Sequence, residues 1–230
     1  MSEIRRDLLT FSVSDTGLRV GVFRIEDVTV RPSTPEFEAF EQTLFEEIRR
    51  ETDLDDIKND PVFRSYRDLY WNHGLDPTKV RVSSEALVRR IVAGQNLWRV
   101  NNVVDSANLA SATLRVPIGL IDEQKIDGGL CVRTARPGET FTRIGGESIA
   151  CRGRELVLAD DAKIVCYGFA SYDSDGTKVT TDTSSVLVVL YGAPVVSAPM
   201  MTALLSRTIE MMSRYIPGRF SVPMQFENQQ

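Results

Sequence analysis

The chain has 230 residues, of which 42% are apolar and 26% charged, as is usual for a globular protein. Its formal net charge of −5 argues at first against a nucleic-acid-binding protein, because phosphate contacts need clustered Lys and Arg. One histidine, His73, excludes a metal site of two or more imidazoles within one chain, and the three dispersed cysteines contain no C-x-x-C pair for a structural zinc site.

The first elements predicted along the chain are a strand over 18–30 and an amphipathic helix over 35–51. The strand segment is rich in β-branched residues. Thr34 can cap the helix, Pro35 suits its first turn, and apolar residues follow at helical spacing. Residues 32–60 hold ten acids and three bases, a net of −7, whereas 61–230 have a net of +2. The acidity therefore belongs to one solvated helix face, and the remainder is open to an anionic partner.

A polar link over 52–60 and three more helices, over 61–73, 81–94 and 100–112, are predicted next. His73 stands at the end of the first of them, where its ring can serve the last carbonyls. In the second, Ser83 or Ser84 can form the cap, and Glu85 can pair with Arg89 one turn later.

The predicted helix over 100–112 has a polar face as well as an apolar one. Asn101, Asp105 and Asn108 fall on that face at helical spacing, beside Asn102. Side-chain amides and carboxylates are poor choices for a helix by propensity. Their placement on one face suggests a polar pocket, although caps and turns would use the same residue types.

After Pro117 the pattern changes to short strands with turns, predicted over 129–134, 140–144, 162–170 and 184–192, and a Met-rich amphipathic helix over 197–216 closes the chain. Helices, then strands, then a closing helix indicate an α+β fold. No apolar run approaches the roughly 20 residues that span a bilayer, and the N-terminus lacks the apolar core of a signal peptide. We therefore expect a cytoplasmic protein.

Five runs taken in order carry a resemblance to a known family: RVSSEALVRRIVAG, VNNVVDSANLAS, VPIGLID, GGLCVRTARPGETFTRIGGE and LVLADDAKIVCYGFASYDSDGTKVTTDTSSVLVVL. They resemble the tRNA-binding B3/B4 domain of the phenylalanyl-tRNA synthetase β subunit, and still more the free-standing bacterial and archaeal proteins built from that domain. The resemblance implies layered mixed sheets with flanking helices. It also implies one B3/B4-like domain over 1–230, with an N-terminal portion (1–78), a core (79–192) and a C-terminal helix (193–230).

In the synthetase this domain hydrolyses the ester between a wrongly attached amino acid and the tRNA 3′ end, so the resemblance implies recognition of tRNA or aminoacyl-tRNA. The editing-site Asn matches Asn108 and its neighbouring Thr becomes Ala107. The editing-site His becomes Gly119, and the Glu becomes Val189, or Leu190 with a slip of one residue. The scaffold is thus similar but the site differs, and motifs for ATP-dependent charging of tRNA are missing.

Ester hydrolysis needs an oriented water, a proton acceptor and stabilisation of charge. For catalysis the candidates are Asp173 and Thr183. The candidates for substrate binding are Asn101, Asn102, Asp105, Asn108, Gly119, Thr177 and Thr180. The candidates for RNA binding are Arg81, Arg89, Arg90 and Arg99. Each polar residue could instead shape a cap or turn, and Arg89 could simply pair with Glu85.

The leading hypothesis is a domain that hydrolyses mischarged aminoacyl-tRNA in trans. The alternatives are a non-catalytic RNA-binding module, a module that docks on an aminoacyl-tRNA synthetase, and a small amino-acid- or amide-binding protein. No metal or cofactor is expected in any of them. Cys166, inside an apolar strand, is expected to be a buried residue rather than a nucleophile.

Overall fold

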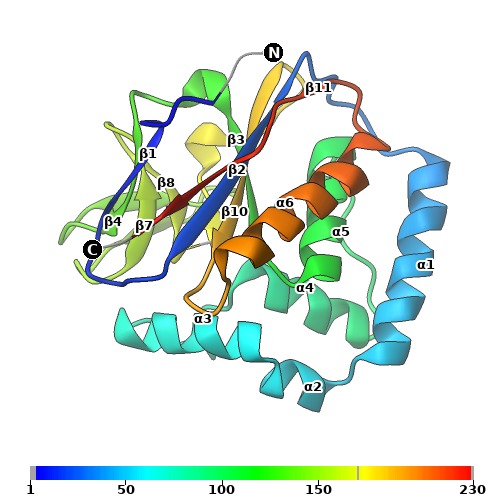
Figure 1. Cartoon of the computed structure of the whole chain (residues 1–230), viewed down its shortest axis with the longest axis horizontal. Helices are drawn as coiled ribbons and strands as arrows, with labels where there is room; N and C mark the ends of the chain where they lie inside the picture. Colours follow the sequence, from blue (N-terminus) through cyan, green and yellow to red (C-terminus); the bar gives the residue numbers. More distant parts are fainter. Residues whose placement is uncertain (1–3, 170, 229–230) are drawn as a thin grey trace.

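The computed structural model describes residues 4–169 and 171–228 and has the predicted α+β composition (Figure 1). The helices are α1 (Pro35–Glu51), α2 (Leu54–Asn59), α3 (Pro61–Asn72), α4 (Ser83–Val92), α5 (Asn102–Leu114) and α6 (Ala198–Ser213), with short 3-10 turns η1 (Glu123–Lys125) and η2 (Asp175–Thr177). The strands are β1 (Leu9–Ser12), β2 (Arg19–Glu26), β3 (Ile118–Asp122), β4 (Leu130–Thr134), β5 (Thr140–Thr142), β6 (Ser148–Ala150), β7 (Leu156–Ala159), β8 (Ile164–Tyr167), β9 (Tyr172–Asp173), β10 (Ser185–Gly192), β11 (Arg219–Phe220) and β12 (Met224–Glu227).

The five predicted helices are all present, and their starts follow local chemistry. The Thr34 hydroxyl accepts a hydrogen bond from the Phe37 amide at the start of α1, and Pro35 occupies the first turn. Ser197 caps α6 in the same way by accepting from the Met200 amide. Side-chain caps therefore set the starts of these two helices, and the cap at Thr34 agrees with the prediction.

Two of the helix predictions were wrong. Residues 52–60 are not only a link, because they contain α2, which Asp53 caps while Asp56 bonds back to the Asp53 amide. Neither Ser83 nor Ser84 caps α4, since the helix begins after Val82 without a side-chain cap.

The strands β3 and β7 were not predicted, although each lies in the core. Every residue of IGLID (118–122) and LVLA (156–159) is buried, so neither run shows the alternation of polar and apolar residues that marks a half-exposed strand. The strand predicted over 162–170 appears as the shorter β8, and residue 170 lies outside the described residues.

Most of the strands form two larger sheets. The first has the order β1-β4-β7-β8-β9, with β1 parallel to β4 and the other pairs antiparallel. The second has the order β11-β2-β10-β3 and is antiparallel, with β12 also paired to β2. β5 and β6 form a separate hairpin.

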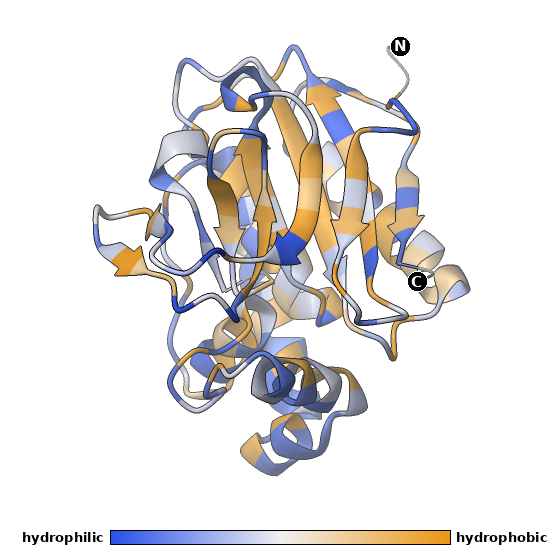
Figure 2. Ribbon diagram, turned by 90° about the vertical axis from the view of Figure 1, so that its left-hand side faces the viewer, coloured by the Kyte–Doolittle hydropathy of each residue, from blue (hydrophilic) through white to orange (hydrophobic). Residues whose placement is uncertain are grey.

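The helices gather on one side of the molecule, where α5 and α6 cover the second sheet (Figure 1). Figure 2 shows hydrophobic residues concentrated along the strands and hydrophilic ones over the helices. Gly21 of β2 allows α6 to approach closely, because a side-chain carbon at this position would come within 2.6 Å of the Met201 sulfur. Within residues 4–169 and 171–228, every helix is too short or too polar to cross a bilayer.

The two sheets meet at the edge strands β3 and β9. β3 is the last strand of the second sheet, and β9 is the last strand of the first. Asp173 of β9 accepts a hydrogen bond from the backbone amide of Leu120 in β3. The outer edge of β3 is therefore partly covered by a carboxylate from the other sheet.

Candidate functional site

Two adjacent hollows lie beside this junction. The outer one has a volume of about 430 Å³ and the inner one about 80 Å³. They share four lining residues: Ser83 of α4, Asn108 of α5, Ser171, and Tyr172 of β9. The outer volume lies within the usual range for small-molecule sites, roughly 300–1,000 Å³.

The outer hollow combines apolar and basic residues. Leu87 and Trp98 supply apolar surface, and Trp98 is 59% exposed. Lys79 and Arg81 add two exposed cations, while the Arg90 guanidinium lies 4.1 Å from the centre of the Trp98 ring. The mouth of the hollow thus offers an aromatic surface together with positive charge.

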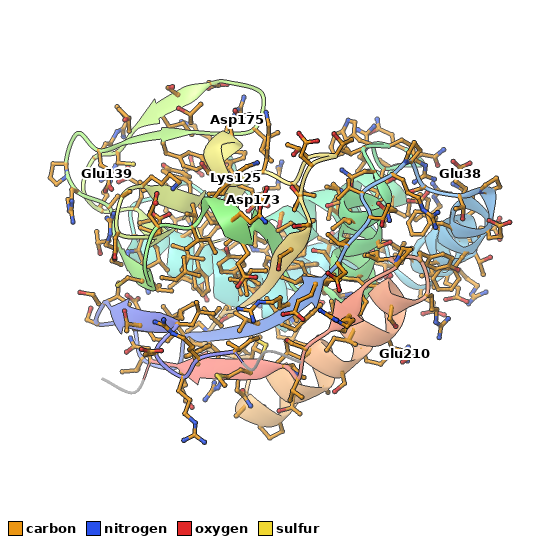
Figure 3. All side chains as sticks on the ribbon, turned by 90° about the horizontal axis from the view of Figure 1, so that it is seen from above. Glu38, Lys125, Glu139, Asp173, Asp175 and Glu210 are labelled. Atoms are coloured by element: carbon orange, nitrogen blue, oxygen red, sulfur yellow. The ribbon has the colours of Figure 1, made fainter. Side chains whose placement is uncertain are left out.

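The inner hollow is lined by Asp173 and Ile118 in addition to the four shared residues. The Asp173 carboxylate accepts from the Leu120 amide at 3.4 Å, and within the described chain it forms no salt bridge with a Lys or Arg. Desolvation by burial raises the pKa of Asp173 to about 6, and the Leu120 hydrogen bond only partly offsets this rise. Figure 3 shows Asp173 near the middle of the molecule, whereas Glu38 and Glu210 lie at its periphery.

Gly119 leaves room for this carboxylate. Its chain neighbour Leu120 bonds Asp173, and a side-chain carbon added at Gly119 would lie 3.1 Å from Asp173 Oδ1 and 3.0 Å from the Tyr191 ring. Tyr191 is fully buried, and its hydroxyl has no hydrogen-bond partner in the described part of the chain. The space that a histidine would need at position 119 is therefore filled by Asp173 and Tyr191.

Gly119 and Val189 are direct cross-strand partners in the β3–β10 pair. These are the two positions that the sequence resemblance assigns to the editing histidine and glutamate. Gly119 lies beside the Asp173 carboxylate, and neither Gly119 nor Val189 is among the residues that line the inner hollow. Asp173 is the one carboxylate among the residues that line the inner hollow.

Three candidates at the start of α5 use their polar side chains in structural hydrogen bonds. Asn101 caps the helix by accepting from the Val103 and Val104 amides. The Asn102 side chain bonds the backbone of the segment after β2, accepting from the Arg31 amide and donating to the Thr29 carbonyl. The side chain of Asp105 is held equally firmly.

Asp105 accepts hydrogen bonds from the Val100 amide at 2.9 Å and the Ser33 hydroxyl at 2.6 Å. None of Asn101, Asn102 and Asp105 lines either hollow. Asn108, two turns further along α5 than Asn101, is the amide that the fold directs to the site.

The three threonine candidates also lie outside the two hollows. The Thr183 hydroxyl donates to Asp122 at 2.8 Å and accepts from the Thr180 amide at 2.9 Å, so it fixes a turn against the end of β3. Thr177 is buried in η2, and its hydroxyl has no partner among the described residues.

The four arginines proposed for RNA contact differ in whether an acidic side chain already pairs with the guanidinium group. Arg89 pairs with the buried Glu85 at 2.8 Å, and Arg99 binds Glu41 through two of its nitrogens. Arg90 lies over Trp98 and Arg81 lines the outer hollow, where it has no salt bridge within the described chain. Arg81 is therefore the one of this group that lines the outer hollow, whereas Arg90 donates hydrogen bonds to the Asn96 carbonyl and the Gln95 side chain.

His73 and Cys166 line neither hollow. The His73 ring does not serve the last carbonyls of α3, as the sequence suggested, but contacts Asp15 Oδ2 at 2.8 Å and the Arg154 carbonyl at 3.0 Å. Cys166 is fully buried in β8, in agreement with its expected role. Within the described residues, no group of three or more His, Cys, Asp or Glu side chains could hold a metal ion.

A model of the B3/4 domain family matches residues 65–214, which is more than half of the chain. The chain belongs to the B3/4 domain family. This confirms the resemblance predicted from the sequence. The matched range includes every residue that lines the two hollows, since all of them fall between 79 and 173.

The relatives of this B3/4 chain are much longer proteins. It is 29% identical over 126 residues to the phenylalanine–tRNA ligase beta subunit of Fusobacterium nucleatum, covering 54% of this chain and 16% of that protein. It is 34% identical over 83 residues to the same subunit of Chromobacterium violaceum, covering 36% and 11%. An N-terminal fragment of the phenylalanyl-tRNA synthetase beta subunit from Pyrococcus horikoshii matches with a TM-score of 0.42 and 15% identity, over 56% of this chain and 46% of that one.

Sequence reasoning on this B3/4 chain missed Lys79, Ser83, Trp98, Ser171 and Tyr172 as lining residues. Ser171 and Tyr172 directly precede Asp173, so that proximity was the available signal. Lys79 and Trp98 flank the α4 segment, and only the packing of α4 against α5 brings them beside Asn108.

Proposed function

We propose that this B3/4 chain binds the aminoacylated 3′ end of a tRNA in the two hollows and hydrolyses the aminoacyl ester in trans. The observation that carries the proposal is that Asn108 and Asp173 line one inner hollow, while Lys79 and Arg81 line the mouth that leads to it. Its similarity to phenylalanine–tRNA ligase beta subunits supports a tRNA-related substrate.

The cations line the outer hollow and the carboxylate lines the inner one, which supports a substrate whose tRNA end lies outside and whose aminoacyl group lies inside. Lys79 and Arg81 can neutralise backbone phosphates, and Trp98 offers a face on which a terminal base can stack. The amide of Asn108 can hold the carbonyl or amine of the aminoacyl group. The ester would then lie close to Asp173.

The Asp173 carboxylate supplies the proton acceptor. A pKa of about 6 makes it largely ionised at neutral pH and still basic enough to take a proton from water. The water oxygen forms a bond to the ester carbonyl carbon, and its proton passes to Asp173. The bond from that carbon to the ribose oxygen breaks, and the proton passes from Asp173 to that oxygen, which yields a free amino acid and an uncharged tRNA.

A deacylation screen of the purified chain against tRNAs carrying different amino acids tests this proposal. We expect release of at least one amino acid above the spontaneous rate, with loss of that activity in Asp173→Asn. The Ser206→Ala variant, at an exposed position of α6 outside both hollows, is the control for general damage and should keep the activity. The absence of release from every charged tRNA would contradict the hydrolase.

A second candidate function is a non-catalytic module that binds RNA or a synthetase. The observation in its favour is that Gly119 and Val189 put no polar group where the family resemblance places the editing histidine and glutamate. Salt-sensitive tRNA binding without deacylation would favour an RNA-binding module. Binding of a free amino acid without tRNA affinity would favour an amino-acid-binding protein instead.

A further inference from the structure

We propose that the inner hollow selects small aminoacyl side chains and excludes aromatic ones. The inference rests on the proposed function, because it assumes that the aminoacyl group occupies the inner hollow and the terminal nucleoside the outer one. It goes further by stating which class of amino acid this B3/4 chain accepts.

The size of the inner hollow is the first argument. Its volume is about 80 Å³. A cavity that holds a benzene molecule is on the order of 150 Å³. The hollow therefore has about half the space that a phenylalanine or tyrosine ring needs, whereas the side chain of glycine, alanine or serine fits.

Two of the wall residues, Ser171 and Tyr172, pack against side chains behind them, which opposes widening of the hollow on that side. The Ser171 hydroxyl lies 2.7 Å from that of the buried Tyr70. The Tyr172 ring stacks on Tyr167 at 6.3 Å, with the Arg143 guanidinium 5.2 Å from its centre. Ser171 and Tyr172 would each have to give up one of these contacts to admit a larger group.

Asp173 and Ile118, the two residues that line only the inner hollow, are also closely packed. Asp173 lies against Gly119 and Tyr191, with Oδ1 only 3.1 Å from the point where a side chain at Gly119 would begin. Ile118 is 9% exposed and belongs to β3, which pairs with β10. Movement of these two residues would therefore disturb the edge of the second sheet.

The polarity of the walls gives the second argument. Ser83, Asn108, Ser171 and Asp173 are four polar residues among the six that line this space, and Ile118 and Tyr172 are the other two. An aromatic ring would strip water from these groups without replacing its hydrogen bonds, which costs free energy. A hydroxymethyl side chain can return a hydrogen bond, and a methyl group leaves room for water.

The outer hollow shows where a ring does fit. It is about five times larger, and Leu87 and Trp98 give it apolar surface. A nucleobase can stack there on Trp98. In this arrangement the nucleobase of an aminoacyl-nucleoside occupies the outer hollow and its aminoacyl side chain occupies the inner hollow.

Binding of non-hydrolysable analogues tests the inference independently of catalysis. The probes are 3′-aminoacylamino-3′-deoxyadenosines, in which an amide replaces the ester, carrying serine, alanine, phenylalanine or tyrosine. We expect the serine and alanine analogues to bind at least tenfold more tightly than the phenylalanine and tyrosine analogues in calorimetric titrations. Equal or tighter binding of the aromatic analogues would overturn the inference.

Enlarging the hollow provides the matched variant. Asn108→Ala removes an amide from the shared wall, and Asn72→Ala, at the exposed end of α3, is its control. We expect the preference for alanine over phenylalanine to fall at least threefold in Asn108→Ala and to stay unchanged in Asn72→Ala. Ile118→Ala should have the same effect if it folds, and an unchanged preference in folded Asn108→Ala and Ile118→Ala would contradict the size argument.

The deacylation screen separates the two proposals. Release of aromatic and small amino acids at similar rates would overturn the size selection and leave the proposed hydrolase intact. The absence of both deacylation and analogue binding would overturn the proposed function and the inference together.

Discussion

The Asp173 carboxylate of the first sheet and the Leu120 amide of the second sheet are joined by a 3.4 Å hydrogen bond. This contact holds an acid at the edge of β3, where no Lys or Arg within the described chain forms a salt bridge with it. An acid in this position is costly to ionise, and the raised pKa of about 6 expresses that cost. It can therefore be useful to function while opposing stability.

Replacing this acid should stabilise the protein. The unfolded-state pKa of Asp is near 3.8, so a folded-state pKa of about 6 means that ionisation costs free energy in the folded state above pH 6. We expect Asp173→Asn to raise the free energy of unfolding at pH 7 by about 1–3 kcal/mol, discounted for the partial exposure of the residue. The difference between the two proteins should shrink as pH falls from 7 to 4. Urea unfolding of both proteins at several pH values measures it, and a less stable variant at pH 7 would contradict the expectation.

The same pKa predicts the pH dependence of the proposed hydrolysis. A base must be deprotonated to accept a proton, so kcat/KM should rise about tenfold per pH unit below 6 and level off above about pH 7. Rates measured from pH 5 to 7.5, corrected for spontaneous ester hydrolysis, test this. A rate that does not change across pH 6 would exclude Asp173 as the base.

Filling the space at position 119 should damage the site. A methyl group there would come within 3.0–3.1 Å of Tyr191 and Asp173, so Gly119→Ala should lower the free energy of unfolding by about 1–3 kcal/mol. It should also reduce deacylation by displacing the carboxylate. Gly129→Ala is the control, because the nearest atom to the added carbon is 3.9 Å away. Similar effects of both substitutions on thermal unfolding would show that position 119 is not specially packed.

The Asn102 side chain should matter to stability rather than to activity. It bonds both the Arg31 amide and the Thr29 carbonyl and lies outside the two hollows. Removing it leaves two partly buried backbone groups without this partner, and we expect Asn102→Ala to cost about 1–3 kcal/mol. Deacylation by the variant that remains folded at 20 °C should stay within about twofold of the original rate. A large loss of activity in a protein of normal stability would return Asn102 to the candidate site.

Arg81 should contribute to tRNA affinity in a salt-dependent way. It is exposed, lines the outer hollow and forms no salt bridge within the described residues. If it contacts one phosphate, Arg81→Gln should weaken binding and lower the slope of log K against log salt by about 0.7–0.9. Arg207→Gln on α6, outside the hollows, is the control and should leave the slope unchanged. Filter binding between 50 and 300 mM salt gives both slopes.

The sequence was most informative where structure depends on near neighbours. Thr34 and Pro35 mark the start of α1, and the pairing of Glu85 with Arg89 follows directly from their spacing. β3 and β7 were missed because residues buried on both faces carry no alternating pattern. β1 depends on a parallel partner more than 100 residues away, which local sequence does not reveal.

In the candidate site, too, local sequence identified residue types but not which of them packing brings together. Asn108 and Asp173 were found from the polar face of α5 and from the family resemblance, and packing brings them to one hollow. Asn101, Asn102 and Asp105 share that polar residue pattern, but they are used to cap α5 and to hold the segment after β2. A helix with a polar face does not reveal which of its residues satisfy the backbone and which face a cavity.

Trp98 gives the molecule a built-in optical reporter. The chain has two tryptophans, and Trp71 lies on the exposed side of α3 while Trp98 forms part of the mouth beneath Arg90. In a Trp71→Phe background, all indole fluorescence would come from the entrance to the hollows. Occupancy by a nucleoside could then be followed in solution with no attached dye, on the timescale of stopped-flow mixing.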